Sequence, residues 1–123
     1  MIYKKISWED YWNLPDQTGA YLVLFFNYKS WYFNGFYHRE DGPAIEWANG
    51  DKFWYFYGER HREDGPAVEC VDGAKEWWIN DFLHREDGPA IEWADGTKSW
   101  YLHGKEYETE EEWGIAKIKD LIV

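Results

Sequence analysis

The sequence predicts a mainly β protein, in which tandem antiparallel β-hairpins form a meander sheet between short N- and C-terminal capping helices. Two observations lead to this fold class. The heptapeptide His-Arg-Glu-Asp-Gly-Pro-Ala begins at residues 38, 61 and 84, so its three copies are 23 residues apart. Asn-Gly or Asp-Gly pairs recur at the same interval, flanked by short apolar and aromatic runs. A fixed period of this length indicates one supersecondary unit per copy.

The N-terminal segment, residues 1–18, is expected to cap the repeats. The stretch that begins at Ser7 has the pattern of a capping box, which predicts a helix start there. The helix should end by Leu14, because Pro15 disfavours the helical conformation at the residue before it.

Residues 19–107 are interpreted as four 23-residue hairpin repeats, the first of them degenerate. Besides the heptapeptides, lysine and tryptophan recur at fixed places in all four copies. These positions are Lys29, Lys52, Lys75, Lys98, Trp31, Trp54, Trp77 and Trp100. The whole chain is therefore expected to be one domain.

Each Asn-Gly or Asp-Gly pair predicts a two-residue type I′ turn, because such pairs tolerate positive φ at successive positions. Around residues 49–50, this turn would place Glu46 opposite Phe53 and Trp47 opposite Lys52. The lysine stem would then lie across the Trp47 ring. One face would be the core, and the other would mix carboxylates with aromatic rings. The residues proposed to bind a partner on this second face are Glu46, Glu69, Glu92, Tyr55, Trp78 and Tyr101. An ordinary solvated face explains the same pattern.

Residues 108–123 are predicted to form the C-terminal capping helix. Thr109 is a favourable N-cap, and the three glutamates after it suit the positive end of a helix dipole. Ile115, Ile118 and Ile122 lie on one stripe, which should dock the helix on the sheet.

Charge and composition restrict the possible partners. The chain has 24 Asp and Glu against 13 Lys and Arg, a formal net charge of -11. This balance argues against direct binding to nucleic acid or to anionic membranes, and favours a protein partner with a basic surface. Aromatic residues make up 22% of the chain, too many for so small a core to bury, so some are expected on a binding surface.

A cytoplasmic location is expected, which would be the host cytoplasm if the chain is encoded by a phage. A single cysteine, Cys70, allows no internal disulfide and fits a reducing compartment. The longest apolar run, residues 20–26, is too short to cross a bilayer, and the first ten residues lack a signal-peptide core.

The heptapeptides are interpreted as structural corners between hairpins. Three equivalent copies would give similar environments rather than one asymmetric catalytic constellation, so no enzyme activity is expected. Neighbouring copies would lie about 9–10 Å apart, too far for their histidines to share one ion, so neither a metal nor a cofactor is expected. Gly42 would permit an unusual φ, and charges would alternate in sign along the stack. The corner residues are His38, Arg39, Asp41, His61, Arg62, Asp64, His84, Arg85 and Asp87.

The pattern Gly-x-x-His-Arg-Glu-Asp-Gly-Pro-Ala, followed by Asp/Asn-Gly and Trp-Tyr over residues 19–107, resembles MORN repeats, in the degenerate form found in small bacterial and bacteriophage proteins. The resemblance implies one elongated sheet of tandem hairpins and a role in protein binding, without catalytic residues. It also implies structural glycines and an aromatic strip. The matching positions are Gly58, Gly73, Gly96, Gly104, Trp54, Trp77 and Trp100. Asp81 departs from the family by replacing a glycine, and the acidity argues against lipid association.

We therefore expect a non-enzymatic binding module: a bacterial or bacteriophage inhibitor that blocks a basic or nucleic-acid-binding site with an acidic, aromatic face. Two alternatives stay open. Exposed Trp and Tyr could bind a small ligand or glycan, and the His-Glu-Asp corners could serve a small hydrolase. Open sheet edges could also pair with a second copy to form a homodimer.

Overall fold

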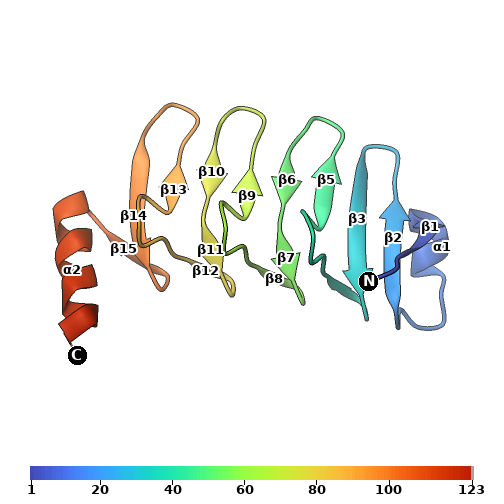
Figure 1. The fold of residues 1–123 in the computed structure, drawn as a ribbon. Helices are drawn as coiled ribbons and strands as arrows, with labels where there is room; N and C mark the ends of the chain where they lie inside the picture. Colours follow the sequence, from blue (N-terminus) through green and yellow to red (C-terminus); the bar gives the residue numbers. More distant parts are fainter. Residues whose placement is uncertain (123) are drawn as a thin grey trace.

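The computed structural model describes the backbone of residues 1–122 and the side chains of residues 1–120. It is mainly β, with a large antiparallel-rich sheet and a helix at each end (Figure 1). In chain order the elements are β1 (Lys4–Ser7), α1 (Trp8–Trp12), β2 (Ala20–Leu24), β3 (Tyr28–Phe33), β4 (Phe36–Tyr37), β5 (Ile45–Trp47), β6 (Lys52–Phe53), β7 (Tyr55–Phe56), β8 (Glu59–Arg60), β9 (Val68–Glu69), β10 (Lys75–Glu76), β11 (Trp78–Ile79), β12 (Phe82–Leu83), β13 (Ile91–Glu92), β14 (Lys98–Leu102), β15 (Lys105–Tyr107) and α2 (Glu110–Ile122).

The large sheet follows the chain almost without crossing. Its strand order is β1-β2-β3-β5-β6-β9-β10-β13-β14-β15, with β4 beside β3, and two small sheets pair β7 with β8 and β11 with β12. Strand β1 runs parallel to β2, whereas the other described pairs are antiparallel. The parallel N-terminal strand was not predicted, because its short Lys-Lys-Ile-Ser sequence carries no turn signal.

The turn predicted at residues 49–50 is of a different type. The Trp47 amide donates to the Asp51 carbonyl at 2.9 Å, and the Gly50 amide donates to the Trp47 carbonyl at 3.0 Å, which closes a three-residue loop. Only Gly50 has a positive φ, 105°. The Asn49 side-chain oxygen accepts from the Asp51 amide at 2.9 Å, which holds the loop in this form. This geometry matches a type I turn with a glycine bulge, so the type I′ prediction was wrong.

The two-residue turns, in which both residues have a positive φ angle, lie at the opposite ends of the strands from the Asn-Gly and Asp-Gly loops. They occur at residues 34–35, 57–58, 80–81 and 103–104. Asp81 keeps this conformation without being a glycine, and its carboxylate accepts from the Arg60 amide at 2.9 Å. Each 23-residue interval therefore contains two chain reversals of different kinds.

The three-residue loop shifts the register by one residue. Glu46 lies opposite Lys52, and Ile45 lies opposite Phe53. The predicted pairing of Glu46 with Phe53 was therefore wrong. Because side chains alternate between faces, a shift of one residue moves every residue of one strand to the other face relative to its partner.

Both helix starts are confirmed by their capping hydrogen bonds. Ser7 Oγ accepts from the Asp10 amide at 3.1 Å, and Thr109 Oγ1 accepts from the Glu112 amide at 3.1 Å. Helix α1 ends at Trp12, before Leu14 as predicted.

The stripe expected to dock α2 is exposed instead. Ile115 and Ile118 are 48% and 57% accessible, and the side chain of Ile122 lies outside the described residues. Trp113, which is 6% accessible, provides the contact by packing on the Trp100 ring at a centroid distance of 4.7 Å. The docking prediction was wrong because one large ring buries more apolar surface here than a row of isoleucines.

Candidate functional site

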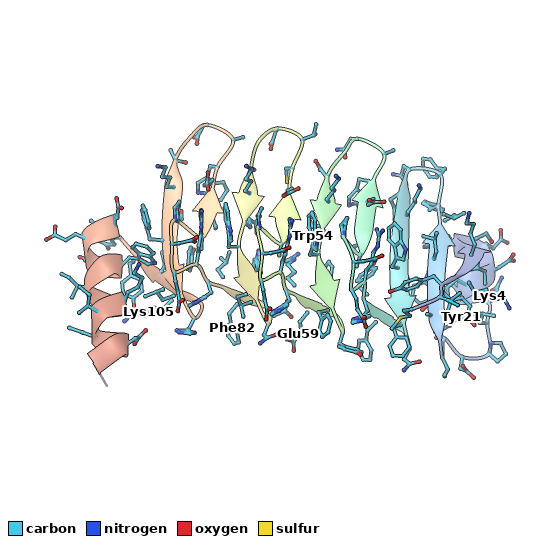
Figure 2. All side chains as sticks on the ribbon, in the orientation of Figure 1. Lys4, Tyr21, Trp54, Glu59, Phe82 and Lys105 are labelled. Carbon is cyan, nitrogen blue, oxygen red and sulfur yellow. The ribbon has the colours of Figure 1, made fainter. Side chains whose placement is uncertain are left out.

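The arginine of each heptapeptide lies over the ring of a tryptophan eight residues earlier in the chain. The Arg62 guanidinium carbon is 3.9 Å from the centroid of Trp54, which Figure 2 labels near the middle of the sheet. The same guanidinium donates to Asp64 at 2.9 Å, to the Pro66 carbonyl at 3.0 Å and to Glu69 at 3.1 Å. Arg85 on Trp77 repeats all of these contacts. Arg39 on Trp31 repeats them except that Glu46 lies 3.8 Å away.

The corner glycine makes room for this guanidinium. A Cβ atom added to Gly65 would lie 3.0 Å from the Arg62 guanidinium carbon. The φ angle of Gly65 is not in the left-handed region. The same holds for Gly42, so the unusual φ expected there is not observed. Arg62 pairs both with Asp64 of its own corner and with Glu69 in strand β9 of the following hairpin. The corner therefore links one hairpin to the next.

The corner histidines join each copy to the next. The Nδ1 atoms of His38, His61 and His84 accept from the amides of Tyr57, Asn80 and His103, at 2.9, 3.1 and 2.9 Å. A ring that accepts at Nδ1 is neutral and carries its proton on Nε2. Burial, with His103 nearby, lowers the pKa of His84, while Glu86 and Asp120 oppose that shift.

The glutamates of the predicted binding face belong to an alternating charge ladder. Across neighbouring strands, each glutamate lies in register between two lysines. The order is Lys29, Glu46, Lys52, Glu69, Lys75, Glu92 and Lys98. An arginine also lies near each glutamate: Arg39 is 3.8 Å from Glu46, Arg62 is 3.1 Å from Glu69, and Arg85 is 2.9 Å from Glu92. Their charge is therefore largely compensated within the chain.

The aromatic half of the predicted binding face lies on the opposite side of the sheet. Tyr55 directly follows Trp54, whose ring lies under the Arg62 guanidinium that also contacts Glu69 of the ladder, so Tyr55 faces away from the ladder. Its ring contacts Tyr37 at 5.1 Å, and Arg60 lies 5.0 Å from the ring centroid of Trp78. By the same alternation, Tyr101 faces away from Lys98. The six residues proposed together therefore form two separate surfaces.

Two hollows separate successive corners. One, of about 760 Å³, is lined by Trp54, Phe56 and residues 39–43 and 61–64. The second, of about 790 Å³, is lined by Trp77, Ile79 and residues 62–65 and 84–87.

The rims of these hollows carry the exposed carboxylates of the corners. The accessible fractions of the side chains are 55% and 82% for Glu40 and Asp41, 83% and 86% for Glu63 and Asp64, and 75% and 86% for Glu86 and Asp87. The corner aspartates were predicted to be structural, and the corner glutamates were not among the predicted site residues. The position of the glutamates in polar loops between strands could have identified them as exposed, because such loops usually lie on the surface.

Two smaller hollows lie near the ends of the sheet. One, of about 380 Å³, is lined mainly by residues 25–29 and 46–52. The other, of about 640 Å³, lies between β15 and α2 and is lined by Lys105, Glu106, Tyr107, Glu108, Glu112, Ile115, Ala116 and Lys119.

Neither metal-ligand clusters nor membrane spans occur in the part of the chain that the structure describes. No three His, Cys, Asp or Glu side chains there are grouped so as to hold an ion. The described helices are too short and too polar to cross a bilayer. Burial, with three acidic neighbours, raises the pKa of the half-buried Cys70 thiol, which keeps it in the unreactive form.

Comparison with known proteins gives no relative for this chain: no family model, curated protein or solved structure matches it.

Proposed function

We propose that the chain is a MORN-like hairpin-repeat module without enzymatic activity, which binds a basic surface of a partner protein through its corner carboxylates. The observation that carries this proposal is the series of exposed carboxylates at residues 40–41, 63–64 and 86–87, which recurs at every corner along the sheet. The sequence period of 23 residues and the recurring Arg-on-Trp clamps support the repeat assignment.

Charge supports the choice of partner. The net charge of -11 attracts a basic surface over long range, and the corners place negative charge where a partner can reach it. The ladder glutamates contribute less, because their side chains are only 33%, 36% and 38% exposed and lysines flank them on both sides. The corner aspartates contact the same arginines but are at least 82% exposed. The proposed site therefore moves from Glu46, Glu69 and Glu92 to the corner loops.

Regular spacing of carboxylates also suits an inhibitor. A nucleic-acid-binding site presents basic side chains at the spacing of phosphates, and rows of carboxylates can occupy them. We propose that this chain acts as a bacterial or bacteriophage inhibitor in the cytoplasm that covers such a basic site. Binding should weaken as salt concentration rises, because exposed charge pairs are screened.

The Nδ1 lone pair of each corner histidine is used by a backbone hydrogen bond, which argues against the hydrolase alternative. In His61, Nδ1 accepts a backbone hydrogen bond and Nε2 lies 3.5 Å from Glu63. A general base needs a free nitrogen directed at a substrate.

The test replaces Glu40, Glu63 and Glu86 with glutamine and measures binding of a deca-lysine peptide by titration calorimetry. Affinity capture from a bacterial lysate supplies the second readout. The matched control replaces Glu59, Glu108 and Glu110, all exposed and outside the corners, so that net charge changes equally. The corner variant should lose peptide binding and the captured partner, while the control keeps both. Equal binding by the two variants would show that only net charge matters.

A further inference from the structure

An aromatic patch lies at the N-terminal end of the sheet. The patch consists of Trp8, Trp12, Phe25 and Phe26, which are 39%, 49%, 40% and 85% accessible. The rings are contiguous, since Trp8 lies 6.5 Å from Trp12 and 5.2 Å from Phe25, and Phe25 lies 4.7 Å from Phe26. Contiguous exposed aromatic rings mark interaction surfaces in soluble proteins.

The hollow beside this patch has an unusual charge for so acidic a chain. Phe25 and Phe26 line it together with Lys29 and Lys52, and Glu46 is its one acidic residue. In each of the three other hollows described above, carboxylates outnumber Lys and Arg. A segment that combines apolar side chains with a carboxylate would therefore be complementary to the patch and its hollow.

The C-terminal helix presents such a segment. Glu111, Ile115 and Ile118 follow the i, i+4, i+7 spacing of one helix face, and all three are exposed. The helix is held by its other side, where Trp113 contacts Trp100 and Lys117 lies 4.2 Å from the Trp113 ring. An amphipathic face with anchors at this spacing can bind in an apolar groove.

We propose that copies of this chain associate head to tail, with the exposed face of α2 in one copy bound to the aromatic patch of the next. The two surfaces lie at opposite ends of the molecule (Figure 1), so they can meet only between copies. In this arrangement, the acidic start of α2 approaches Lys29 and Lys52, while Ile115 and Ile118 contact the aromatic rings. A heterologous contact of this kind leaves a free end on each assembly, which permits further addition.

Sedimentation velocity of the full chain over a concentration series tests this proposal. The weight-average mass should rise to at least twice the 14.9 kDa monomer. Phe26→Ser and Ile118→Ser should each remain monomeric, because each removes one of the two surfaces. Val71→Ser, at a residue that is 68% exposed and belongs to neither surface, is the matched control and should associate like the wild type. Circular dichroism of each variant checks that the fold is retained.

Mixing the two defective variants distinguishes head-to-tail contact from other modes. The Phe26→Ser chain keeps a competent α2, and the Ile118→Ser chain keeps a competent patch, so an equimolar mixture should form dimers and nothing larger. A wild type that stays monomeric at every concentration would overturn the proposal, whether or not a foreign helix binds the patch. So would dimers of Ile118→Ser alone, which would indicate patch-to-patch contact. Neither result bears on the corner carboxylates, which these variants leave intact.

Discussion

Trp54 and Trp100 occupy equivalent positions in the chain, 46 residues apart, yet they are covered by different groups. The Arg62 guanidinium lies 3.9 Å above the Trp54 ring, whereas the ring of Trp113 from α2 packs on Trp100 at 4.7 Å. Within the array, each tryptophan is covered by the corner that follows it. The last copy has no such corner, since Tyr107 and Glu108 stand where histidine and arginine would be.

The helix takes the place of the missing corner and makes different contacts. Trp113 Nε1 donates to the Arg85 carbonyl at 3.2 Å, which ties the cap to the last heptapeptide. The Lys117 ammonium donates to the Glu86 carbonyl and lies over the Trp113 ring. Trp31, Trp54, Trp77 and Trp100 are thus all covered, the first three by an arginine and the last by a tryptophan ring.

Removing the terminal cover should have the largest effect. Trp113→Ala should lower the free energy of unfolding by about 3–5 kcal/mol, as large buried rings do when truncated. Urea denaturation measures the change, and hydrogen exchange locates it. Loss of protection should be greatest in β14 and α2. Equal loss near β2 and β3 would show that the cap stabilises the whole sheet and not its end.

Removing an internal cover should have a smaller effect. Arg62→Ala should lower the free energy of unfolding by about 2–3 kcal/mol, because a cation–π contact and charge-assisted hydrogen bonds are lost. Arg62→Lys is the control for charge, and should recover only part of the stability because lysine cannot form the planar fork. Full recovery by lysine would mean that charge, and not the stacked geometry, holds the corner.

A change inside the terminal helix should stabilise it. Gly114 lies within α2, and an added Cβ would meet no atom within 4 Å. Gly114→Ala should therefore raise the free energy of unfolding by about 0.5–1 kcal/mol. Gly65→Ala, which crowds the Arg62 guanidinium, should instead be destabilising under the same conditions. A destabilised Gly114→Ala variant would contradict the open space seen there.

The smallest expected effect is the response of the last corner to pH. Burial lowers the pKa of His84 below its ordinary value of 6.5, so the unfolded chain binds more protons in that range. Stability from this group is complete above pH 6.5 and falls as pH drops below it, because a protonated Nδ1 cannot accept from the His103 amide. Thermal melting at pH 7.5 and at pH 5.5 measures this loss. His84→Asn should show a weaker pH dependence of the melting temperature, and an unchanged dependence would mean that other groups cause it.

Much of the fold could be predicted from the sequence where the signal is local. Ser7 and Thr109 cap helices through their own hydroxyls, so the two helix starts follow from spacing alone. The register could not be predicted, because Asn-Gly serves both a two-residue and a three-residue loop. The hydrogen bond from the Trp47 amide to the Asp51 carbonyl selects the three-residue loop, and this bond depends on how the two strands of the hairpin pair.

The candidate site was harder to predict for the same reason. Glu46 was selected as an exposed acid, and the structure places it between Lys29 and Lys52 with Arg39 nearby. Whether a carboxylate is compensated depends on neighbours across strands, and these neighbours follow from the register. One residue of shift was enough to separate the predicted glutamates from the predicted aromatic rings.

The 23-residue period, the two helix starts and the acidic balance follow from the chain without its fold, because they depend on composition and on residues close together in sequence. The ring that each arginine covers, the carboxylates that reach solvent and the helix face that stays free follow only from the folded chain. These features arise from contacts between strands and between copies, where a single hydrogen-bonded loop sets the alignment of every side chain beyond it.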